Sequence, residues 1–312
     1  MAEAQVRAGD ESGRARAAKT RRGVVLTLVG GTCWGFSGTC AKFLMDSYGV
    51  DPLWLVCVRQ LLASVLFIAL AAALPRDREH LREFVRARGG GLATMGGLAL
   101  TALCMMANSG GYVITIDLTN SATATVLQTL GLVVLMLFAC VAARRLPRRR
   151  EAAGVVLALA GTFLLATGGD PTRLAMPLDG LAWGIFTGVS YALYTAVPAK
   201  LLRRWGSPLV NGVAMLLSGL VLLVRTRPWQ SVPALDLTGM VWLAVIVVVG
   251  TFLAFALYLQ GVKDLGPLRA SMLGTSEPIA ATVFSVLWLG TAFSPADLVG
   301  FGLIIVMVYL TA

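Results

Sequence analysis

The sequence is poor in charged residues. Asp, Glu, Lys and Arg make up 13% of its 312 residues, whereas hydrophobic residues make up 57%. A soluble globular protein carries about 25% charged residues. Apolar runs of roughly 20 residues, the length that crosses a bilayer, fill most of the chain. This composition excludes a soluble globule and predicts an integral membrane protein.

Groups that bind metals or carry out catalysis are also scarce. The chain has one histidine, His80, and its five cysteines all lie inside apolar runs without a C-x-x-C pair. We therefore predict no disulfide framework, no metal site and no other cofactor. The absence of a Walker A string argues against direct use of ATP by this chain.

One string resembles part of an enzyme. Residues 35–38 match the short G-x-S-G string of rhomboid-like intramembrane proteases. Such a serine needs a base within hydrogen-bond reach. His80 falls in a polar link on the side opposite to Ser37, so this dyad cannot form, and we expect no enzyme activity.

The apolar runs predict ten transmembrane helices, which short polar links join. Their ranges are 23–44, 53–74, 91–115, 121–142, 152–168, 179–198, 207–224, 238–260, 267–289 and 296–312. Residues 1–22 form a basic tail without an apolar face, which predicts a disordered segment. The expected fold class is an all-α integral membrane protein.

Lysine and arginine are distributed unevenly between the two sides of this helix array. Of the 26 such residues, twenty lie on one side, in the tail and in the links 75–90, 143–151, 199–206 and 261–266. Only Arg173, Arg225 and Arg227 lie in links on the other side. The positive-inside rule then places both termini in the cytoplasm. The basic links favour contact with anionic lipid over nucleic acid.

Two stretches of the chain resemble each other. A shift of 146 positions places segment 119–154 on segment 265–300. We infer two homologous halves, 23–168 and 169–312, with five spans each. An odd number of spans inserts the halves in opposite orientations, which is the inverted-repeat plan of many secondary carriers.

In these features the chain resembles the drug/metabolite transporter superfamily, specifically ten-span carriers with two EamA-type halves. The resemblance covers about residues 23–312, and it rests on the strings at 30–35 (GGTCWG), 120–128 (NSATATVLQ), 266–267 (GP) and 277–278 (EP). Similar proteins often have a proline in span 4 where this chain has Leu132, the repeat partner of Pro278. The missing proline removes one hinge candidate.

Glu277 is the sharpest single candidate, because it alone among the sixteen acidic residues lies near the middle of an apolar run. A carboxylate is costly there, so its side chain should face protein or water. Desolvation favours the protonated form, as a proton carrier requires. Two interpretations stay open: a substrate or proton-coupling site, or a structural carboxyl bonded to backbone groups that Pro278 frees.

Arg59, in span 2, also has two interpretations. It is an ion-pair candidate for an anionic substrate group or for Glu277. Alternatively, its long side chain reaches the outer headgroups or locks one helix to its neighbour.

Polar and aromatic side chains at comparable depth predict a small-molecule cavity. Its candidate residues are Trp34, Asn108, Tyr112, Thr125, Gln128, Tyr191, Tyr194, Tyr258, Ser276 and Glu277. The repeat places Tyr112 and Tyr258 at equivalent positions. The resemblance implies a cavity lined by spans 1, 3, 4, 6, 8 and 9. The alternative is that these side chains only pack and hydrogen-bond between helices.

These observations predict secondary transport of a small metabolite by alternating access across a plasma membrane, that of a bacterium. Similar proteins often export amino acids or drug-like compounds, which favours export over uptake or exchange. A membrane enzyme or a non-transporting scaffold is the remote alternative. The few intramembrane charges favour a neutral, zwitterionic or partly apolar solute. The expected partners are this solute, the lipid bilayer and protons as the candidate coupling ion, without nucleic acid; no oligomeric state is predicted.

Overall fold

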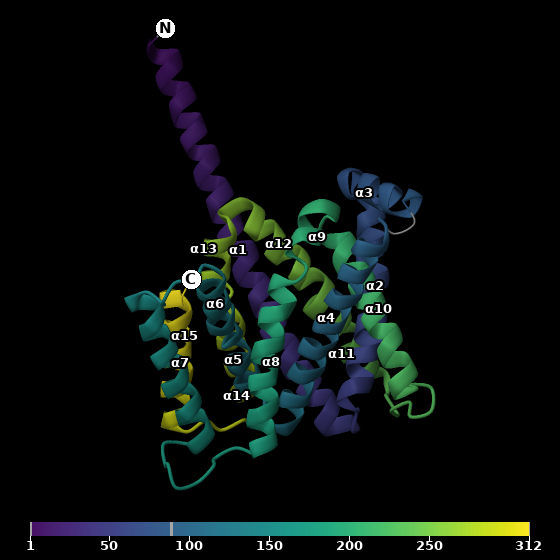
Figure 1. Ribbon diagram of the computed structural model, residues 1–312, viewed down its shortest axis with the longest axis vertical. Coiled ribbons are helices and arrows are strands. Elements are labelled where there is room, and N and C mark those ends of the chain that lie inside the picture. Colours follow the sequence, from purple (N-terminus) through teal and green to yellow (C-terminus); the bar gives the residue numbers. More distant parts are fainter. Residues whose placement is uncertain (1, 88–89, 312) are drawn as a thin grey trace.

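The computed structural model describes the backbone of residues 2–87 and 90–311, and the side chains of residues 17–311 except 76, 88–89, 267–268 and 271. The regular elements in these ranges are helices (Figure 1). They are α1 (Ala2–Tyr48), α2 (Pro52–Ala73), α3 (Pro75–Arg86), α4 (Leu92–Leu118), α5 (Ser121–Thr129), α6 (Gly131–Ala142), α7 (Arg149–Thr167), α8 (Leu178–Ala196), α9 (Ala199–Trp205), α10 (Ser207–Thr226), α11 (Leu237–Val247), the π-helix η1 (Val248–Leu253), α12 (Ala254–Leu265), α13 (Pro267–Leu273), α14 (Ser276–Leu287) and α15 (Pro295–Thr311).

Each predicted span corresponds to one helix or to a short run of helices. In the described part of the chain, seven helices or continuous runs are long and apolar enough to cross a membrane, and the bent pair α8–α9 makes an eighth. The ninth and tenth predicted spans coincide with α13–α14 and with α15, and α14 and α15 are shorter apolar helices. The expected all-helical membrane architecture is confirmed, with span edges that differ by a few residues.

The polar segments differ more from expectation. α1 begins at Ala2, so the backbone of the tail that we expected to be disordered continues the helix of the first span. Alanine, arginine and glutamate are good helix formers, and an anchored helix is easily extended through them. The 75–90 link contains α3, which begins with Pro75 in its first turn, a favoured place for proline. Phe84 of α3 packs edge-on against Trp205 of α9.

Helix contacts follow the two halves. α1 packs along α12 and α14, and α8 packs along α4, α5 and α6, the repeat equivalents of those two. The pairs α2–α10 and α7–α15 join equivalent spans of the two halves, and they lie on opposite sides of the molecule in Figure 1. A twofold exchange of the halves produces this pattern, as expected for an inverted repeat.

Glycines allow α1 to approach the second half closely. A Cβ atom at Gly35 would overlap the backbone of Glu277 and Ala281 in α14. A Cβ atom at Gly30 would lie 3.0 Å from the carbonyl oxygen of Ala254 in α12. Small residues at such crossings are typical of membrane helices, and here they place α1 directly beside the backbone of Glu277.

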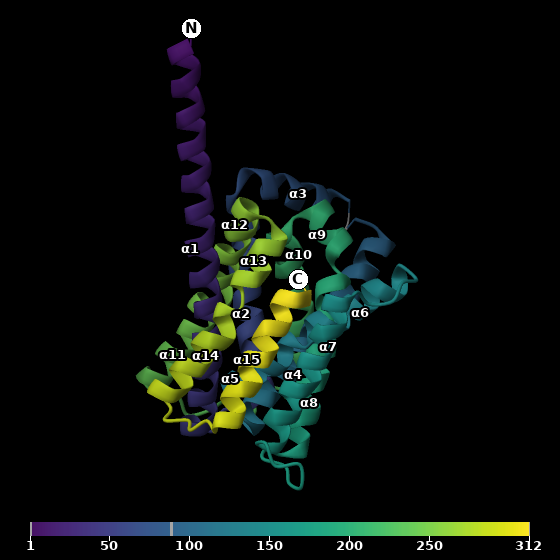
Figure 2. The ribbon, with the colours of Figure 1, turned by 90° about the vertical axis from the view of Figure 1, so that its left-hand side faces the viewer.

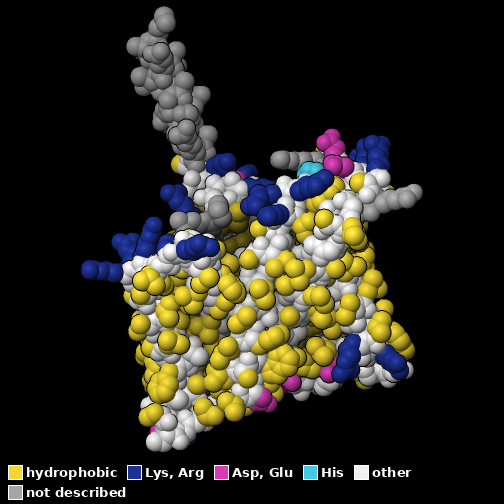
Figure 3. Space-filling model, viewed as in Figure 1, with side chains coloured by type: hydrophobic (Ala, Val, Ile, Leu, Met, Phe, Trp, Pro, Cys, Tyr) yellow, Lys and Arg dark blue, Asp and Glu magenta, His cyan; other side chains and the backbone are white. Residues whose placement is uncertain are grey.

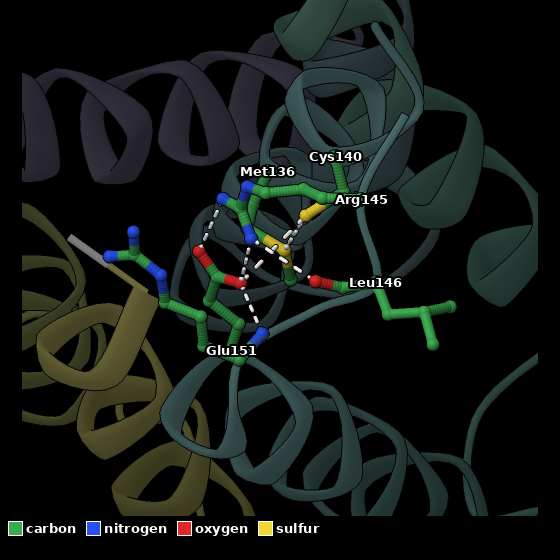
Figure 4. A network of polar contacts seen from close by, with 6 residues as sticks. Met136, Cys140, Arg145, Leu146 and Glu151 are labelled. Carbon is green, nitrogen blue, oxygen red and sulfur yellow. Dashed lines mark hydrogen bonds and ion pairs between the residues drawn. The ribbon is translucent and has the colours of Figure 1, made fainter. Parts of the chain in front are cut away.

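Both chain termini lie at one end of the molecule, called the terminal end below; the opposite end is the distal end (Figures 1 and 2). Lys and Arg side chains gather at the terminal end, above a broad apolar band (Figure 3). At this end Arg145 donates hydrogen bonds of 2.7 and 2.8 Å to the carboxylate of Glu151, and the Arg148 backbone N–H donates a third of 2.6 Å (Figure 4). These bonds fix the link between α6 and α7.

Candidate functional site

A cavity of about 350 Å³ lies between the two halves. Its wall is built from α1, α2, α4, α5, α6 and from α8, α9, α10, η1, α12, α14 and α15. A volume of this size suits a small organic solute. The cavity therefore occupies the repeat interface, where inverted-repeat carriers hold their substrates.

Most of the predicted cavity residues meet at this wall. Eight of the ten line it, namely Trp34, Asn108, Tyr112, Gln128, Tyr191, Tyr194, Tyr258 and Glu277, and so does Arg59. They come from both halves of the chain. The equivalent tyrosines, Tyr112 and Tyr258, both reach the same space.

Two predicted residues lie elsewhere. The Thr125 hydroxyl lies 2.8 Å from the Tyr112 hydroxyl and donates to the Ser121 carbonyl, so it supports the wall from behind. The Ser276 hydroxyl donates to the Leu28 carbonyl of α1 at 3.3 Å. Successive helical residues point about 100° apart. Ser276 therefore faces α1, while its neighbour Glu277 faces the cavity.

Glu277 and Arg59 contribute a carboxyl group and a guanidinium group from opposite halves. No ion pair joins them, and neither side chain has a hydrogen-bond partner within the described residues. A carboxyl group and a guanidinium group therefore face one cavity, and neither is bonded to another described side chain.

Aromatic rings form one wall of the cavity. The Trp34 ring lies 5.0 Å from the rings of both Phe255 and Tyr258, measured between centroids. Tyr191 and Tyr194 of α8 line the cavity from the other half. Rings at these distances pack favourably, and they offer a flat apolar surface to a solute.

Side-chain amides add polar groups to the wall. Gln128 donates a hydrogen bond of 3.0 Å to Asn108, which ties α5 to α4. Asn211 of α10 donates a hydrogen bond of 2.9 Å to Ser207 and lies 3.4 Å from the Tyr194 hydroxyl. The sequence reasoning missed Asn211, although a lone asparagine in an apolar run was a signal for it.

The lining also includes spans that were not expected there. Arg59 and Gln60 come from span 2, Asn211 and Met215 from span 7, and Val308 from span 10. The resemblance implied a cavity lined by spans 1, 3, 4, 6, 8 and 9. Spans 2 and 7, which pack against each other along their length, also reach it.

Both halves carry a helix break at the cavity wall. α5 gives way to α6 around Leu130, and α13 gives way to α14 around Thr275. Under the 146-residue shift, these breaks coincide to within a residue. Span 4 thus has a local irregularity even though Leu132 stands where similar proteins have a proline. Instead Gly131 lies against the backbone of Gly188 in α8. Irregular backbone at membrane depth is tolerated where it lines a cavity.

Hydroxyl groups join three helices on the distal side of the cavity. The Ser121 hydroxyl of α5 lies 3.0 Å from that of Thr39 in α1 and 2.9 Å from that of Ser285 in α14. All three side chains are buried. None of them lines the cavity.

Aromatic rings also close the distal side of the cavity, further from the cavity than the hydroxyl groups. Trp288 stacks on Phe43 with 5.2 Å between centroids and lies 4.6 Å from Trp242. We call the whole closure the distal seal: Thr39, Ser121, Ser285, Phe36, Phe43, Trp242 and Trp288.

Toward the terminal end the cavity continues. Ser207, the first residue of α10, and Leu202 of α9 still line it, and so does Leu259 in the middle of α12. The surface is hollowed below the basic edge in Figure 3. The structure thus has a cavity that extends toward the terminal end and is sealed on the distal side.

Comparison with known families is decisive for the class of protein. The profile of the EamA-like transporter family matches residues 21–167 and 178–312. This chain belongs to the EamA-like transporter family. It is a membrane transporter with two EamA domains, and the family is not one of enzymes.

Individual relatives of this EamA-like transporter agree. It is 31% identical over 291 residues to an uncharacterized inner membrane transporter of Salmonella typhimurium, YicL, covering 93% of this chain and 95% of the relative. It is 22% identical over 286 residues to the Escherichia coli K12 inner membrane transporter YedA, covering 89% and 86%. A crystal structure with 18% identity matches with a TM-score of 0.60 over 92% of this chain and 96% of the other, which supports the fold alone.

Proposed function

We propose that this EamA-like transporter is a secondary carrier that exports a small zwitterionic metabolite of the amino-acid type. The observation that carries the proposal is one guanidinium and one carboxylate facing the same cavity from opposite halves, without a described protein partner. The solute carboxylate would accept bonds from Arg59, and its ammonium would donate to Glu277. Charge-assisted bonds of this kind are the strong ones.

The rest of the cavity suits the body of such a solute. Trp34, Tyr191 and Tyr258 supply flat apolar surface, and this favours an apolar or aromatic side chain. Drug-like compounds with an amine and an aromatic ring share these features. A polyanion would meet one cation only, which disfavours it.

The shape of the cavity supports export. The basic residues at the terminal end favour a cytoplasmic location for that end, and the names of the inner membrane relatives support an inner membrane. With this orientation the cavity receives solute from the cytoplasm, and the distal seal must open to release it. Uptake or exchange through the same cavity is the second candidate, because a carrier of this design runs in either direction down a gradient.

Glu277 is the proposed coupling group. It lies beside the cavity space, and the Pro278 that follows it cannot donate a backbone hydrogen bond. Proton binding and ammonium binding at one carboxylate exclude each other. A proton that enters from outside would therefore release the solute. Each export step would then be coupled to the entry of a proton.

Counterflow in proteoliposomes tests the transport proposal. Vesicles loaded with unlabelled L-leucine, L-phenylalanine and L-tyrosine should accumulate the labelled amino acids only when the protein is present. Arg59→Leu should abolish the exchange, whereas Arg225→Leu, at an exposed arginine of α10, should retain it. Wild-type protein that exchanges none of the three would contradict the proposed solute class. Normal exchange by Arg59→Leu would contradict the proposed site.

A further inference from the structure

Gln60 is buried at the cavity wall without a hydrogen-bond partner. Its side chain is 2% exposed, and it lines the cavity next to Arg59. Neither its amide oxygen nor its amide nitrogen is bonded within the described part of the structure. By contrast, the amide of Gln128 on the same cavity is bonded to Asn108. A buried amide without a partner destabilises the fold unless something else binds it.

The helix opposite Gln60 is also irregular. α2 packs against η1, a π-helical turn in the middle of span 8, and both Gly250 and Thr251 of η1 line the cavity. The Thr251 hydroxyl donates to the Ile246 carbonyl five residues earlier, which satisfies one group of the widened turn. Single π-helical turns are uncommon and occur frequently at functional sites. Two independent irregularities, an unpartnered amide and a π-helical turn, thus line the same cavity on two helices that pack together.

We propose that Gln60 selects the transported solute by hydrogen-bonding to a neutral group of its side chain, a hydroxyl or a carboxamide. This inference rests on the proposed function. The Gln60 amide offers an acceptor and two donors, so its complement is a group that both donates and accepts. Arg59 and Glu277 bind the charged groups of the solute, and Gln60 hydrogen-bonds to the polar group of the solute side chain.

Such a site discriminates between solutes with and without the polar group. A solute without the polar group leaves the Gln60 amide unpaired in the bound state, whereas a solute with it satisfies the amide. L-tyrosine and L-phenylalanine differ by one hydroxyl and both suit the aromatic wall. We expect the wild-type protein to bind L-tyrosine more tightly, by roughly three- to tenfold, the effect of one hydrogen bond.

Gln60→Leu tests the inference, because leucine fills a similar space without polar atoms. The competition of L-tyrosine and L-phenylalanine for exchange is measured, together with the melting temperature in the absence of solute. We expect Gln60→Leu to lose the preference for L-tyrosine, while its melting temperature equals or exceeds that of the wild type. Gln128→Leu is the matched control, and it should melt at a lower temperature because it leaves Asn108 unpaired.

The outcomes separate the two proposals. Wild-type protein that exchanges neither amino acid contradicts the proposed function. Wild-type exchange without a preference for L-tyrosine, or a preference that Gln60→Leu keeps, overturns the role of Gln60 alone. A fall in melting temperature for Gln60→Leu as large as that for Gln128→Leu also overturns it, because it would show that Gln60 is structural.

Discussion

At the scale of single residues, the cavity combines two ionisable side chains with polar groups that already have hydrogen-bond partners. The hydroxyl of Tyr112 is bonded to Thr125, and Gln128 is bonded to Asn108. Arg59 and Glu277, in contrast, have no bonded partner in the described residues. The satisfied groups hold the wall in shape, and the unsatisfied ones are those that we propose to bind the solute and protons.

Glu277→Gln separates coupling from binding. The amide keeps the size of the side chain but takes up no proton. We expect accumulation driven by a proton gradient to be lost. Counterflow exchange needs no net proton movement, so it should persist, but at a higher solute concentration, because the neutral amide binds the ammonium more weakly than a carboxylate does. Both are measured in the same proteoliposomes with labelled L-tyrosine. A well-folded Glu277→Gln protein that still accumulates solute with unchanged pH dependence would remove the coupling role.

The equivalent tyrosines should respond differently to the loss of their hydroxyl groups. Tyr112→Phe leaves Thr125 without its 2.8 Å partner, so we expect it to lower the free energy of unfolding by about 1 kcal/mol. Tyr258 has no bonded partner in the described residues, so Tyr258→Phe should leave the melting temperature unchanged. It should weaken solute binding about three- to tenfold. Thermal unfolding and competition for exchange measure the two effects; the reverse pattern would place the solute at Tyr112.

The sequence allowed us to predict which residue types lie at a given membrane depth. It did not allow us to predict the direction in which each side chain points. Glu277 stood out because hydropathy alone isolates a carboxyl in an apolar run. Thr125 and Ser276 have the same polarity and depth as residues that line the cavity, yet they face neighbouring helices. Gln60 carries no sequence signal beyond its position next to Arg59. Its significance depends on which partners it lacks, and only the packed structure shows them.

At the scale of helices, the close contact between α1 and α14 determines where Glu277 lies. Gly35 is the point of closest approach, because its missing side chain leaves room for the backbone of Glu277 and Ala281. The position of the carboxyl therefore depends on a glycine in the other half of the chain.

Gly35→Ala tests this contact. The added methyl group must push α14 away, and overpacking of this kind costs about 1–3 kcal/mol. We expect a lower melting temperature together with weaker exchange. The control is Gly302→Ala in α15, where an added Cβ atom meets nothing within 4 Å. It should leave exchange intact and stability unchanged or slightly raised. Equal behaviour of the two variants would show that the α1–α14 contact is not tight.

The order and approximate limits of the apolar segments were predictable because hydropathy and link composition determine them, whereas helix shape was not. The break at Leu130 forms without the proline that usually marks such a site, since Gly131 and Gly188 let α5, α6 and α8 meet closely. The π-helical turn η1 likewise has no local sequence signature. Helices α3 and α9 were hidden in links that we interpreted only as basic.

At the scale of the whole molecule, the two halves enclose one cavity and close it on one side only. The distal seal joins α1, α5 and α14 through hydroxyl groups and stacked rings. A few neutral hydrogen bonds of about 1 kcal/mol each are weak enough to break and reform during a transport cycle.

Orientation is tested by single cysteines. Val85→Cys and Pro147→Cys lie in links at the terminal end, and Arg173→Cys lies in a distal link with an exposed side chain. With both termini in the cytoplasm, a membrane-impermeant maleimide should label intact cells at position 173 only. The native cysteines, of which Cys33 alone is half-exposed, provide the background. Labelling of position 147 from outside would reverse the orientation.

Alternating access through the distal seal is the central claim, and the accessibility of one buried serine tests it most directly. Ser121→Cys is placed in a variant without the native cysteines, and labelling by an impermeant maleimide on the distal side is followed with and without L-tyrosine exchange. We predict no labelling at rest, because Ser121 is fully buried, and rapid labelling during exchange, as the seal opens. Exchange at the wild-type rate with Ser121→Cys still unlabelled would contradict passage of the solute through this seal.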